Sequence, residues 1–244
     1  IIHHALLDII NMSKYSIIIP TFNEKKNIFI FIKKIKKFLK KNNYEIIVVD
    51  DNSYDGSITV FNKIKKKERK FSFYIRREKK RDLSKSIILG IKKSKFNNLI
   101  IMDGDLQHNP KYLPILIKNF NTQKQDILVA VRNFKKRSGL SNIRFFLSLS
   151  LIALINLIFK KKTTDPMSGF FVVKKTVFIR SRKKLYGKGF KILFDIIYSS
   201  NKNIKVNDYS IKFDSRKNNK SKMSLKILFH IFLLVIQKMI NRLI

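Results

Sequence analysis

Short apolar runs alternate along the first half of the chain with segments in which apolar residues recur every three to four positions. The runs are too continuously apolar to face water on one side and predict buried strands, whereas the second pattern predicts amphipathic helices. We expect strands at Ile17–Pro20, Glu45–Asp51, Phe71–Arg77, Asn98–Asp103 and Asp126–Val131, and helices at Asn27–Lys41, Ser57–Lys67, Leu83–Ser94 and Tyr112–Phe120. This alternation predicts an α/β fold with a parallel, doubly wound sheet.

Acidic residues gather where the predicted strands end. The pair Asn23–Glu24 follows the first strand, Asp50–Asp51 ends the second, and Asp103 and Asp105 follow the fourth. Ligands of such sheets bind outside the carboxyl ends of the strands, so we expect these side chains at one edge. An Asp-x-Asp pair recurs by chance, but its hard oxygen atoms suit Mg²⁺ or Mn²⁺, which keep open positions for phosphate oxygens.

Two apolar segments follow in the second half of the chain. Arg144–Phe159 is uncharged after its first residue and is shorter than the roughly 20 residues that span a bilayer, which favours a buried or membrane-facing helix. Leu225–Ile244 is apolar apart from a polar stripe of Lys226, His230, Gln237 and Asn241, widened by Lys238 and Arg242. This pattern favours a helix lying in a membrane interface, and the alternative is a helix docked on the protein's own core.

Composition changes this picture only slightly. There is no cysteine, so disulfides and thiolate chemistry are excluded. The formal net charge of +37 would suit nucleic acid, but it is spread along the chain and no zinc-finger or ribonucleoprotein motif accompanies it. A basic surface suits anionic lipid headgroups and phosphorylated substrates equally well.

Four motifs in a fixed order carry a resemblance to a known family. They are "IIIPTFNE" (Ile17–Glu24), "VVDDNSYDGS" (Val48–Ser57), "MDGDLQHNP" (Met102–Pro110) and "DPMSGFFVVKK" (Asp165–Lys175). Together they resemble the family 2 inverting glycosyltransferases of the GT-A fold, with a mixed, mostly parallel sheet. The segments "GFKILFDI" and "RKNNKSKMS" narrow the resemblance to the dolichyl- or polyprenyl-phosphate mannose synthases.

The resemblance implies roles for individual residues. It implies a nucleotide-sugar site formed by Pro20, Phe22, Glu24, Val49, Asp51, Gly104, Arg216 and Lys222. It implies Mg²⁺ or Mn²⁺ held by Asp103, Asp105 and Gln107, and an acceptor phosphate held by Arg132, Arg144 and Ser148. Asp103, Asp105, Arg132 and Asp165 are then the catalytic candidates, although Asp165 could instead fix the turn ahead of "SGF".

The chain departs from the family pattern in two places. The glycine of the loop that resembles a closing loop over the donor is Asn219, which tolerates positive φ better than most residues. The usual glycine before "LS" is Asp82. We expect a carboxylate there to repel a donor diphosphate unless Arg81 or a lysine compensates.

By resemblance, the expected reaction transfers mannose from GDP-mannose, with inversion, to a dolichyl or polyprenyl phosphate. The alternatives are another donor such as UDP-glucose, another acceptor, or, from a different class, a basic nucleic-acid-binding protein. We expect an N-terminal extension (1–12), a catalytic domain (13–224) and an amphipathic membrane-interface helix (225–244). The expected location is peripheral, on the cytoplasmic face of a membrane. A separate membrane-anchoring partner stays open, and we expect no nucleic-acid partner.

Overall fold

The computed structural model describes residues 13–39, 43–132, 155, 158–212 and 233–240. The strands there are β1 (Lys14–Thr21), β2 (Asn43–Asp50), β3 (Phe71–Ile75), β4 (Asn98–Ile101), β5 (Ile127–Arg132), β6 (Phe171–Lys174) and β7 (Val206–Ile211). The helices are α2 (Lys25–Phe38), α3 (Ser57–Lys67), α4 (Leu83–Lys93), α5 (Leu113–Thr122), α7 (Lys175–Ser181) and α8 (Ile192–Ser199), with short 3₁₀ turns at Pro110–Tyr112 and Arg182–Lys184.

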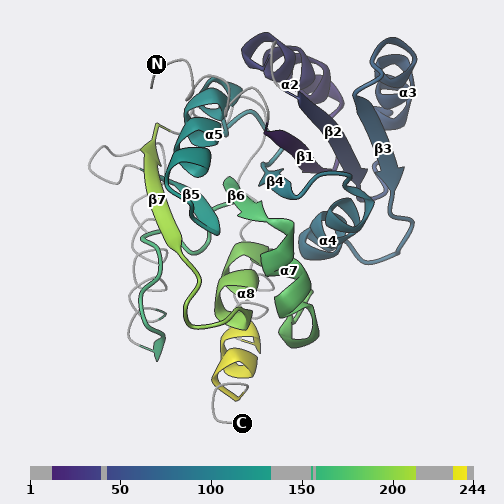
Figure 1. The fold of residues 1–244 in the computed structure, drawn as a ribbon. Coiled ribbons are helices and arrows are strands. Elements are labelled where there is room, and N and C mark those ends of the chain that lie inside the picture. The colour runs from purple at the N-terminus through teal and green to yellow at the C-terminus, as the bar shows by residue number, and fades with distance from the viewer. Residues whose placement is uncertain (1–12, 40–42, 133–154, 156–157, 213–232, 241–244) are drawn as a thin grey trace, which may run out of the picture.

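The strands form one sheet in the order β3-β2-β1-β4-β6-β5-β7 (Figure 1). Pairing is parallel from β3 through β4 and between β5 and β7, whereas β6 runs antiparallel to both of its neighbours. The predicted fold class, α/β with a mixed, mostly parallel sheet, is therefore confirmed. All the strands and helices predicted up to Val131 are present, and α3 has the predicted bounds.

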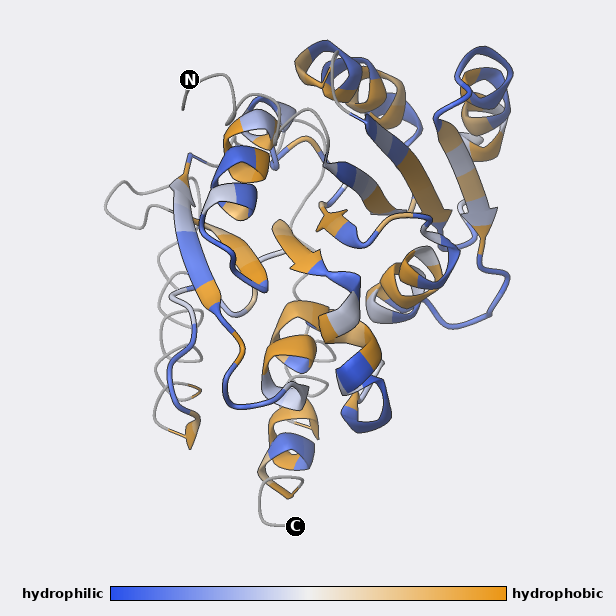
Figure 2. Cartoon of the chain, viewed as in Figure 1, coloured by the Kyte–Doolittle hydropathy of each residue, from blue (hydrophilic) through white to orange (hydrophobic). Residues whose placement is uncertain are grey.

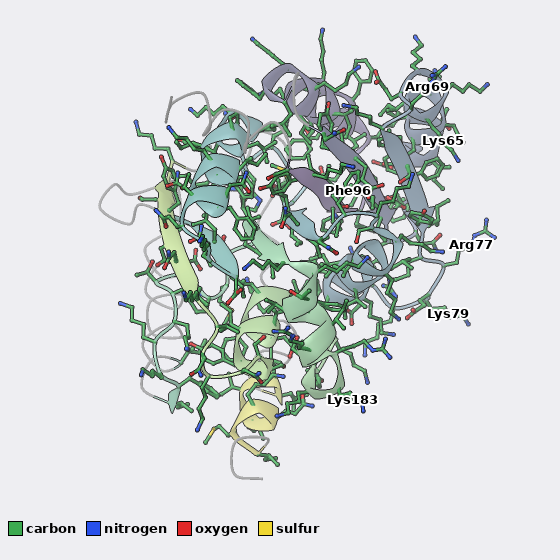
Figure 3. The ribbon with its side chains drawn as sticks, viewed as in Figure 1. Lys65, Arg69, Arg77, Lys79, Phe96 and Lys183 are labelled. Atoms are coloured by element: carbon green, nitrogen blue, oxygen red, sulfur yellow. The ribbon has the colours of Figure 1, made fainter. Side chains whose placement is uncertain are left out.

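Two apolar layers cover the sheet because successive strand residues face opposite sides. Ile17 and Ile19 pack with α2, α3 and α5 on one face, and Ile18 packs with α4, α7 and α8 on the other. Figure 2 shows the inner faces of these helices and most of β2, β4, β5 and β6 as hydrophobic, β7 as largely hydrophilic, and α8 as hydrophobic nearly all round. The basic side chains labelled in Figure 3, among them Lys65, Arg77 and Lys183, lie at the periphery of the molecule.

The described part of the C-terminal segment, residues 233–240, is helical and packs on the protein itself. Leu234 and Val235 join a buried cluster with Ile155, Phe159 and Phe194. For residues 233–240 these contacts favour the docked alternative, and Lys238, which the sequence pattern assigned to the polar stripe, is only 2% exposed. Contact of this segment with a membrane stays a prediction. Within the described ranges, no helix combines the length and apolar character that crossing a bilayer requires.

Asp126 ties three strands together just before β5 begins. Its carboxylate accepts hydrogen bonds from Lys174 Nζ at 2.9 Å and Lys205 N at 3.1 Å, at the ends of β6 and β7. Burial opposes its ionisation, but these two partners outweigh that effect and hold its pKa below the usual 3.8.

This lowered pKa predicts part of the protein's sensitivity to acid. The stabilisation from ionised Asp126 is complete above about pH 4 and is lost as pH falls through the lower pKa of the folded state. We therefore expect the free energy of unfolding of Asp126→Asn to fall less steeply than that of the wild type below about pH 4. Urea unfolding across this range measures both slopes, and equal slopes would contradict the assignment.

Candidate active site

The topology brings three strand ends together at one edge of the sheet. β2, β1 and β4 are adjacent and parallel, so the loops that follow them leave from the same edge. Two hydrogen bonds fix the start of these loops, from Asp51 N to Thr21 O (2.9 Å) and from Met102 N to Ile18 O (3.2 Å). This edge carries the acids that the sequence singled out.

Asp50 is the member of that set whose carboxylate holds the loops together. It is fully buried and accepts hydrogen bonds from Thr21 Oγ1 (2.9 Å), Ser53 N (2.7 Å) and Ser53 Oγ (2.6 Å). Ser53 Oγ in turn accepts a hydrogen bond from Asn23 N at 2.8 Å. Asp50 therefore connects the loop after β1 to the loop after β2.

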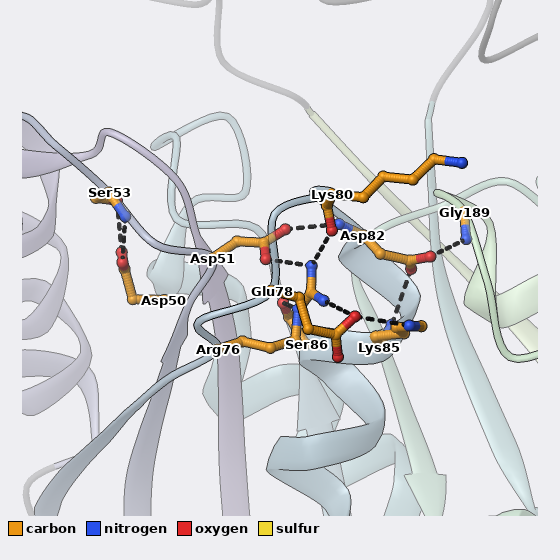
Figure 4. Close-up of polar contacts among 10 residues, drawn as sticks. All are labelled: Asp50, Asp51, Ser53, Arg76, Glu78, Lys80, Asp82, Lys85, Ser86 and Gly189. Atoms are coloured by element: carbon orange, nitrogen blue, oxygen red, sulfur yellow. Dashed lines mark hydrogen bonds and ion pairs between the residues drawn. The ribbon is translucent and has the colours of Figure 1, made fainter.

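Asp51, the next residue, lies in a buried ionic network (Figure 4). It pairs with Arg76, and its Oδ2 accepts the backbone N–H of Asp82 at 2.7 Å. Burial raises the pKa of Asp51, while the Asp82 N–H and the Arg76 charge act in the opposite direction. Arg76 also pairs with Glu78 at 2.8 Å and donates to Lys80 O at 2.9 Å, so the guanidinium is held in place.

An aromatic group borders this network. The Phe22 and Tyr54 rings meet edge to face with centroids 5.7 Å apart, and the Arg81 guanidinium lies 4.1 Å from the Phe22 centroid. Tyr54 is 83% exposed. Flat aromatic and guanidinium surfaces of this kind can stack on a planar base. Arg81 thus contacts Phe22, whereas the sequence had suggested that it might offset the charge of Asp82.

The "DGD" segment places two carboxylates on either side of a tightly packed glycine. A methyl group on Gly104 would lie 3.3 Å from the Ile19 and Thr21 side chains, so the backbone here runs close to β1. Asp105 Oδ1 accepts the N–H of Gln107 at 3.1 Å, across Leu106, whose φ is +66°. A positive φ is uncommon for leucine and marks a constrained turn.

His108 stabilises the backbone of the same loop. It is buried, its ring lies 5.4 Å from that of Phe170, and its Nδ1 accepts the backbone N–H of Asp103 at 3.1 Å. The Asp103 Oδ2 atom is 3.8 Å from this nitrogen. The histidine of the motif therefore shapes the backbone that presents Asp103.

These residues fit a divalent cation that is shared with a ligand. Asp103 and Asp105 are partly exposed, supply hard oxygen atoms and leave room for further ligands. In the part of the chain that the structure describes, no group of three or more His, Cys, Asp or Glu side chains could hold a metal. Mg²⁺ commonly binds through one or two carboxylates together with substrate phosphates, which matches this donor set.

Gly169 bounds the candidate metal site on its other side. A Cβ atom there would lie 2.4 Å from Asp103 Oδ2, so no larger residue fits without displacing the carboxylate. Asp165 builds the turn that leads to it, because its Oδ1 accepts Met167 N at 3.2 Å and its carbonyl accepts Ser168 N at 3.2 Å. This geometry supports the alternative role of Asp165 in the turn, and a catalytic role stays a prediction.

We expect Gly169→Ala to lower any activity that depends on Asp103 about a hundred-fold while the protein stays folded, because only the flexible end of Asp103 has to move. Gly90→Ala is the matched control: its Cβ would lie 2.5 Å from the buried Ile18 side chain, in the core between α4 and the sheet. That variant should lose stability but keep its activity per folded molecule. Thermal unfolding and turnover, measured on both variants, test the assignment, and an active Gly169→Ala enzyme would contradict it.

The remaining predicted residues divide into two groups. Pro20 and Val49 are paired residues of β1 and β2, and Val49 is fully buried. Glu24 is the N-cap residue of α2, and its carboxylate accepts a hydrogen bond from Asn27 Nδ2 at 2.7 Å. The backbone of Arg132 ends β5, but its side chain lies outside the description. Arg144, Ser148, Arg216, Asn219 and Lys222 lie outside the described residues. Sequence reasoning missed Arg76, whose position just after β3 was the available signal.

Comparison with known proteins gives a consistent assignment. The sequence profile of "Glycosyl transferase family 2" matches residues 16–182. The chain is 34% identical over 222 residues to dolichol-phosphate mannosyltransferase from Pyrococcus furiosus, covering 88% of this chain but only 61% of that protein. It is 28% identical over 230 residues to the protein of the same name from Mycosarcoma maydis, covering 88% of this chain and 75% of that protein.

Solved structures agree at the level of the fold. Glucosyl-3-phosphoglycerate synthase from Mycobacterium tuberculosis, crystallised with Mn²⁺, UDP-glucose and phosphoglyceric acid, superposes with a TM-score of 0.74 at 14% identity, covering 98% of this chain and 82% of that one. Mannosyl-3-phosphoglycerate synthase from Rubrobacter xylanophilus gives a TM-score of 0.67 at 15% identity, covering 95% and 74%. On the profile match, which covers more than half of the chain, the chain belongs to glycosyl transferase family 2.

Proposed function

We propose that this protein transfers a hexose from a nucleotide sugar to the phosphate of a polyprenol or dolichol, with inversion at the anomeric carbon. Mannose from GDP-mannose is the first candidate, because two relatives are named dolichol-phosphate mannosyltransferases. UDP-glucose is the second candidate, and its support is weaker, since the neighbour crystallised with it shares the fold at 14% identity.

One observation carries this proposal. The Asp103 and Asp105 carboxylates lie on the same sheet edge as the Asp51 network and the Phe22 and Tyr54 rings. A nucleoside diphosphate has a planar base, a ribose and two charged phosphates, and this edge offers a partner for each part. The base would meet the rings, the nucleoside would meet Asp51, and the diphosphate would share Mg²⁺ or Mn²⁺ with Asp103 and Asp105.

The proposed step is a single displacement. An oxygen of the lipid phosphate forms a bond to the anomeric carbon as the bond to the diphosphate oxygen breaks, and the diphosphate keeps the electron pair. A cation bound at Asp103 and Asp105 would offset the charge that develops on this leaving group. With a second pKa of about 6, the acceptor phosphate is already largely dianionic near neutral pH, so the step needs no general base.

The described surface also carries exposed apolar and basic residues that would suit a lipid substrate. Ile179, Met239 and Ile240 are 58%, 41% and 50% exposed, and the basic residues Arg182–Lys184 follow α7. Lys238 Nζ donates to Lys184 O at 2.7 Å, which joins helix 233–240 to this basic turn. Exposed apolar groups beside lysines and arginines fit an anionic leaflet, which agrees with peripheral binding at the cytoplasmic face of a membrane.

The test is transfer of labelled sugar into organic-extractable lipid. Purified full chain is incubated with polyprenyl phosphate in vesicles and Mg²⁺ or Mn²⁺, with GDP-mannose and UDP-glucose in parallel reactions. Label in lipid from one donor names the sugar. Transfer to a soluble acceptor such as phosphoglyceric acid, with none to lipid, would contradict the acceptor. Tight, salt-sensitive RNA binding that ignores Asp105→Asn would favour the nucleic-acid hypothesis instead.

A further inference from the structure

Asp82 is the residue at which the chain departs from the family's glycine, and the structure gives its carboxylate two partners. It is the N-cap of α4, where one carboxylate oxygen accepts Lys85 N at 3.0 Å and the other accepts Gly189 N at 2.9 Å. Its own backbone N–H donates to Asp51 Oδ2 at 2.7 Å (Figure 4). One residue thus joins the start of α4, a distant loop and the Asp51 carboxylate.

The distant loop is itself firmly held. Gly189 is buried with φ of +89°, and its carbonyl accepts Ser84 N at 2.9 Å, so two hydrogen bonds connect this glycine to the first turn of α4. Two residues earlier, Gly187 N donates to Asp195 at 2.7 Å. The loop is therefore anchored to α8 as well as to α4. It can act as a fixed support for the peptide that meets Asp51.

We infer that Asp82 is a positioning residue for the nucleotide donor, tying the Asp51 carboxylate to the Gly189 loop. This inference rests on the proposed function, in which Asp51 contacts the nucleoside. If the peptide before Asp82 could rotate freely, the Asp82 N–H would no longer donate to Asp51. In the described contacts, the Asp51 carboxylate would then be held by Arg76 alone. The Asp82 side chain restrains that peptide because its two oxygens accept hydrogen bonds from Lys85 N and Gly189 N.

The sequence-based expectation for Asp82 was the opposite, namely repulsion of a diphosphate. The structure offers a reason why repulsion need not dominate. The Asp82 charge lies at the N-terminus of α4, where the helix dipole and two backbone N–H groups stabilise an anion. Removing the charge separates the two accounts by sign: repulsion predicts tighter nucleotide binding, and positioning predicts weaker binding.

Asp82→Asn is the informative substitution. Asparagine is as good an N-cap as aspartate but has one acceptor oxygen, so it can keep the bond from Lys85 N only by giving up the bond from Gly189 N. Asp126→Asn is the charge control, because it also removes one carboxylate that accepts two hydrogen bonds, from Lys174 Nζ and Lys205 N, but lies on the turn before β5, away from Asp51 and the Gly189 loop.

The experiment measures the affinity of GDP and UDP with Mn²⁺ by calorimetry for the full chain. We expect Asp82→Asn to weaken binding about ten-fold, as loss of one charge-assisted hydrogen bond implies, and Asp126→Asn to change it less than two-fold. In an Asp51→Asn background the Asp82 substitution should have little further effect, which a simple loss of helix capping would not produce. Equal or tighter binding by Asp82→Asn would overturn the inference.

A second readout separates this inference from the proposed function. If the wild type binds neither nucleotide, the proposed function fails. Amide hydrogen exchange then still tests whether the Asp82 side chain restrains the Gly189 loop. Asp82→Asn must then speed exchange at residues 187–189 relative to Asp126→Asn. Unchanged exchange at these residues would overturn the inference that Asp82 restrains this loop, whichever ligand the protein binds.

Discussion

Asp105→Asn and Asp103→Asn are each expected to lower sugar transfer to lipid about a thousand-fold, equivalent to roughly 4 kcal/mol of transition-state stabilisation. In the proposed site, each substitution would remove one of the two negative oxygen ligands of the cation. The charge that develops on the departing diphosphate would then be poorly compensated. Folding should be nearly unaffected, because both side chains are partly exposed at the sheet edge.

The matched control for this experiment is Asp126→Asn. It also removes one carboxylate, but from the turn that joins β5 to β6 and β7, away from the strand ends that carry the acids. Its turnover at neutral pH should stay within a few-fold of the wild type. Steady-state turnover of the three variants, each confirmed as folded by circular dichroism, gives the comparison. An Asp105→Asn enzyme as active as Asp126→Asn would remove the metal site from the account.

Lys238→Met is expected to lower the free energy of unfolding by about 3 kcal/mol, the largest stability effect we anticipate from a charged residue. Lys238 Nζ lies 2.6 Å from Asp195 Oδ1, and the side chains of Lys238 and Asp195 are almost fully buried. Lys238 Nζ also donates a hydrogen bond to Lys184 O. Burial lowers the pKa of Lys238, and the Asp195 charge acts against this shift. Without the lysine, an anion stays buried with only Tyr186 N, Gly187 N and Ser199 Oγ as partners.

An exposed ion pair on the same protein supplies the control. Lys36 pairs with Glu68, and their side chains are 45% and 28% exposed, so Lys36→Met should cost less than about 1 kcal/mol. Urea unfolding measures both differences. In the double variant Lys238→Met/Asp195→Asn, part of the loss should be recovered, because the unpaired charge is gone. A Lys238→Met protein as stable as Lys36→Met would mean that helix 233–240 is not docked through this pair.

The local pattern of apolar and polar residues was sufficient to predict the strands and helices in the first half of the chain. Continuous apolar strands and amphipathic helices such as α3 leave a clear signal because each faces a defined environment. α8 was missed since it is buried on nearly every side and shows no polar face from which a helical period could be read. β6 was missed because α7 begins at the residue directly after it, so no turn residues mark where this short apolar run ends.

The candidate site shows the same division. Spacing and strand ends were enough to select Asp51, Asp103 and Asp105, since parallel strands must share an edge. Arg76 was distinguished from 53 basic residues only by its position just after β3, and its role depends on burial, which the sequence does not display. Lys238 was placed on the surface for the same reason. Its partner Asp195 comes from another helix, so only the tertiary structure brings the two together.

The most direct test of the central claim is whether metal and nucleotide bind together at this edge. Calorimetry should measure GDP and UDP binding with and without Mn²⁺ for the wild type and for Asp103→Asn/Asp105→Asn. We predict that Mn²⁺ tightens binding of one nucleotide at least ten-fold in the wild type and has no effect on the double variant. Binding that is independent of Mn²⁺, or equal in both proteins, would contradict the claim that these carboxylates share a cation with a diphosphate.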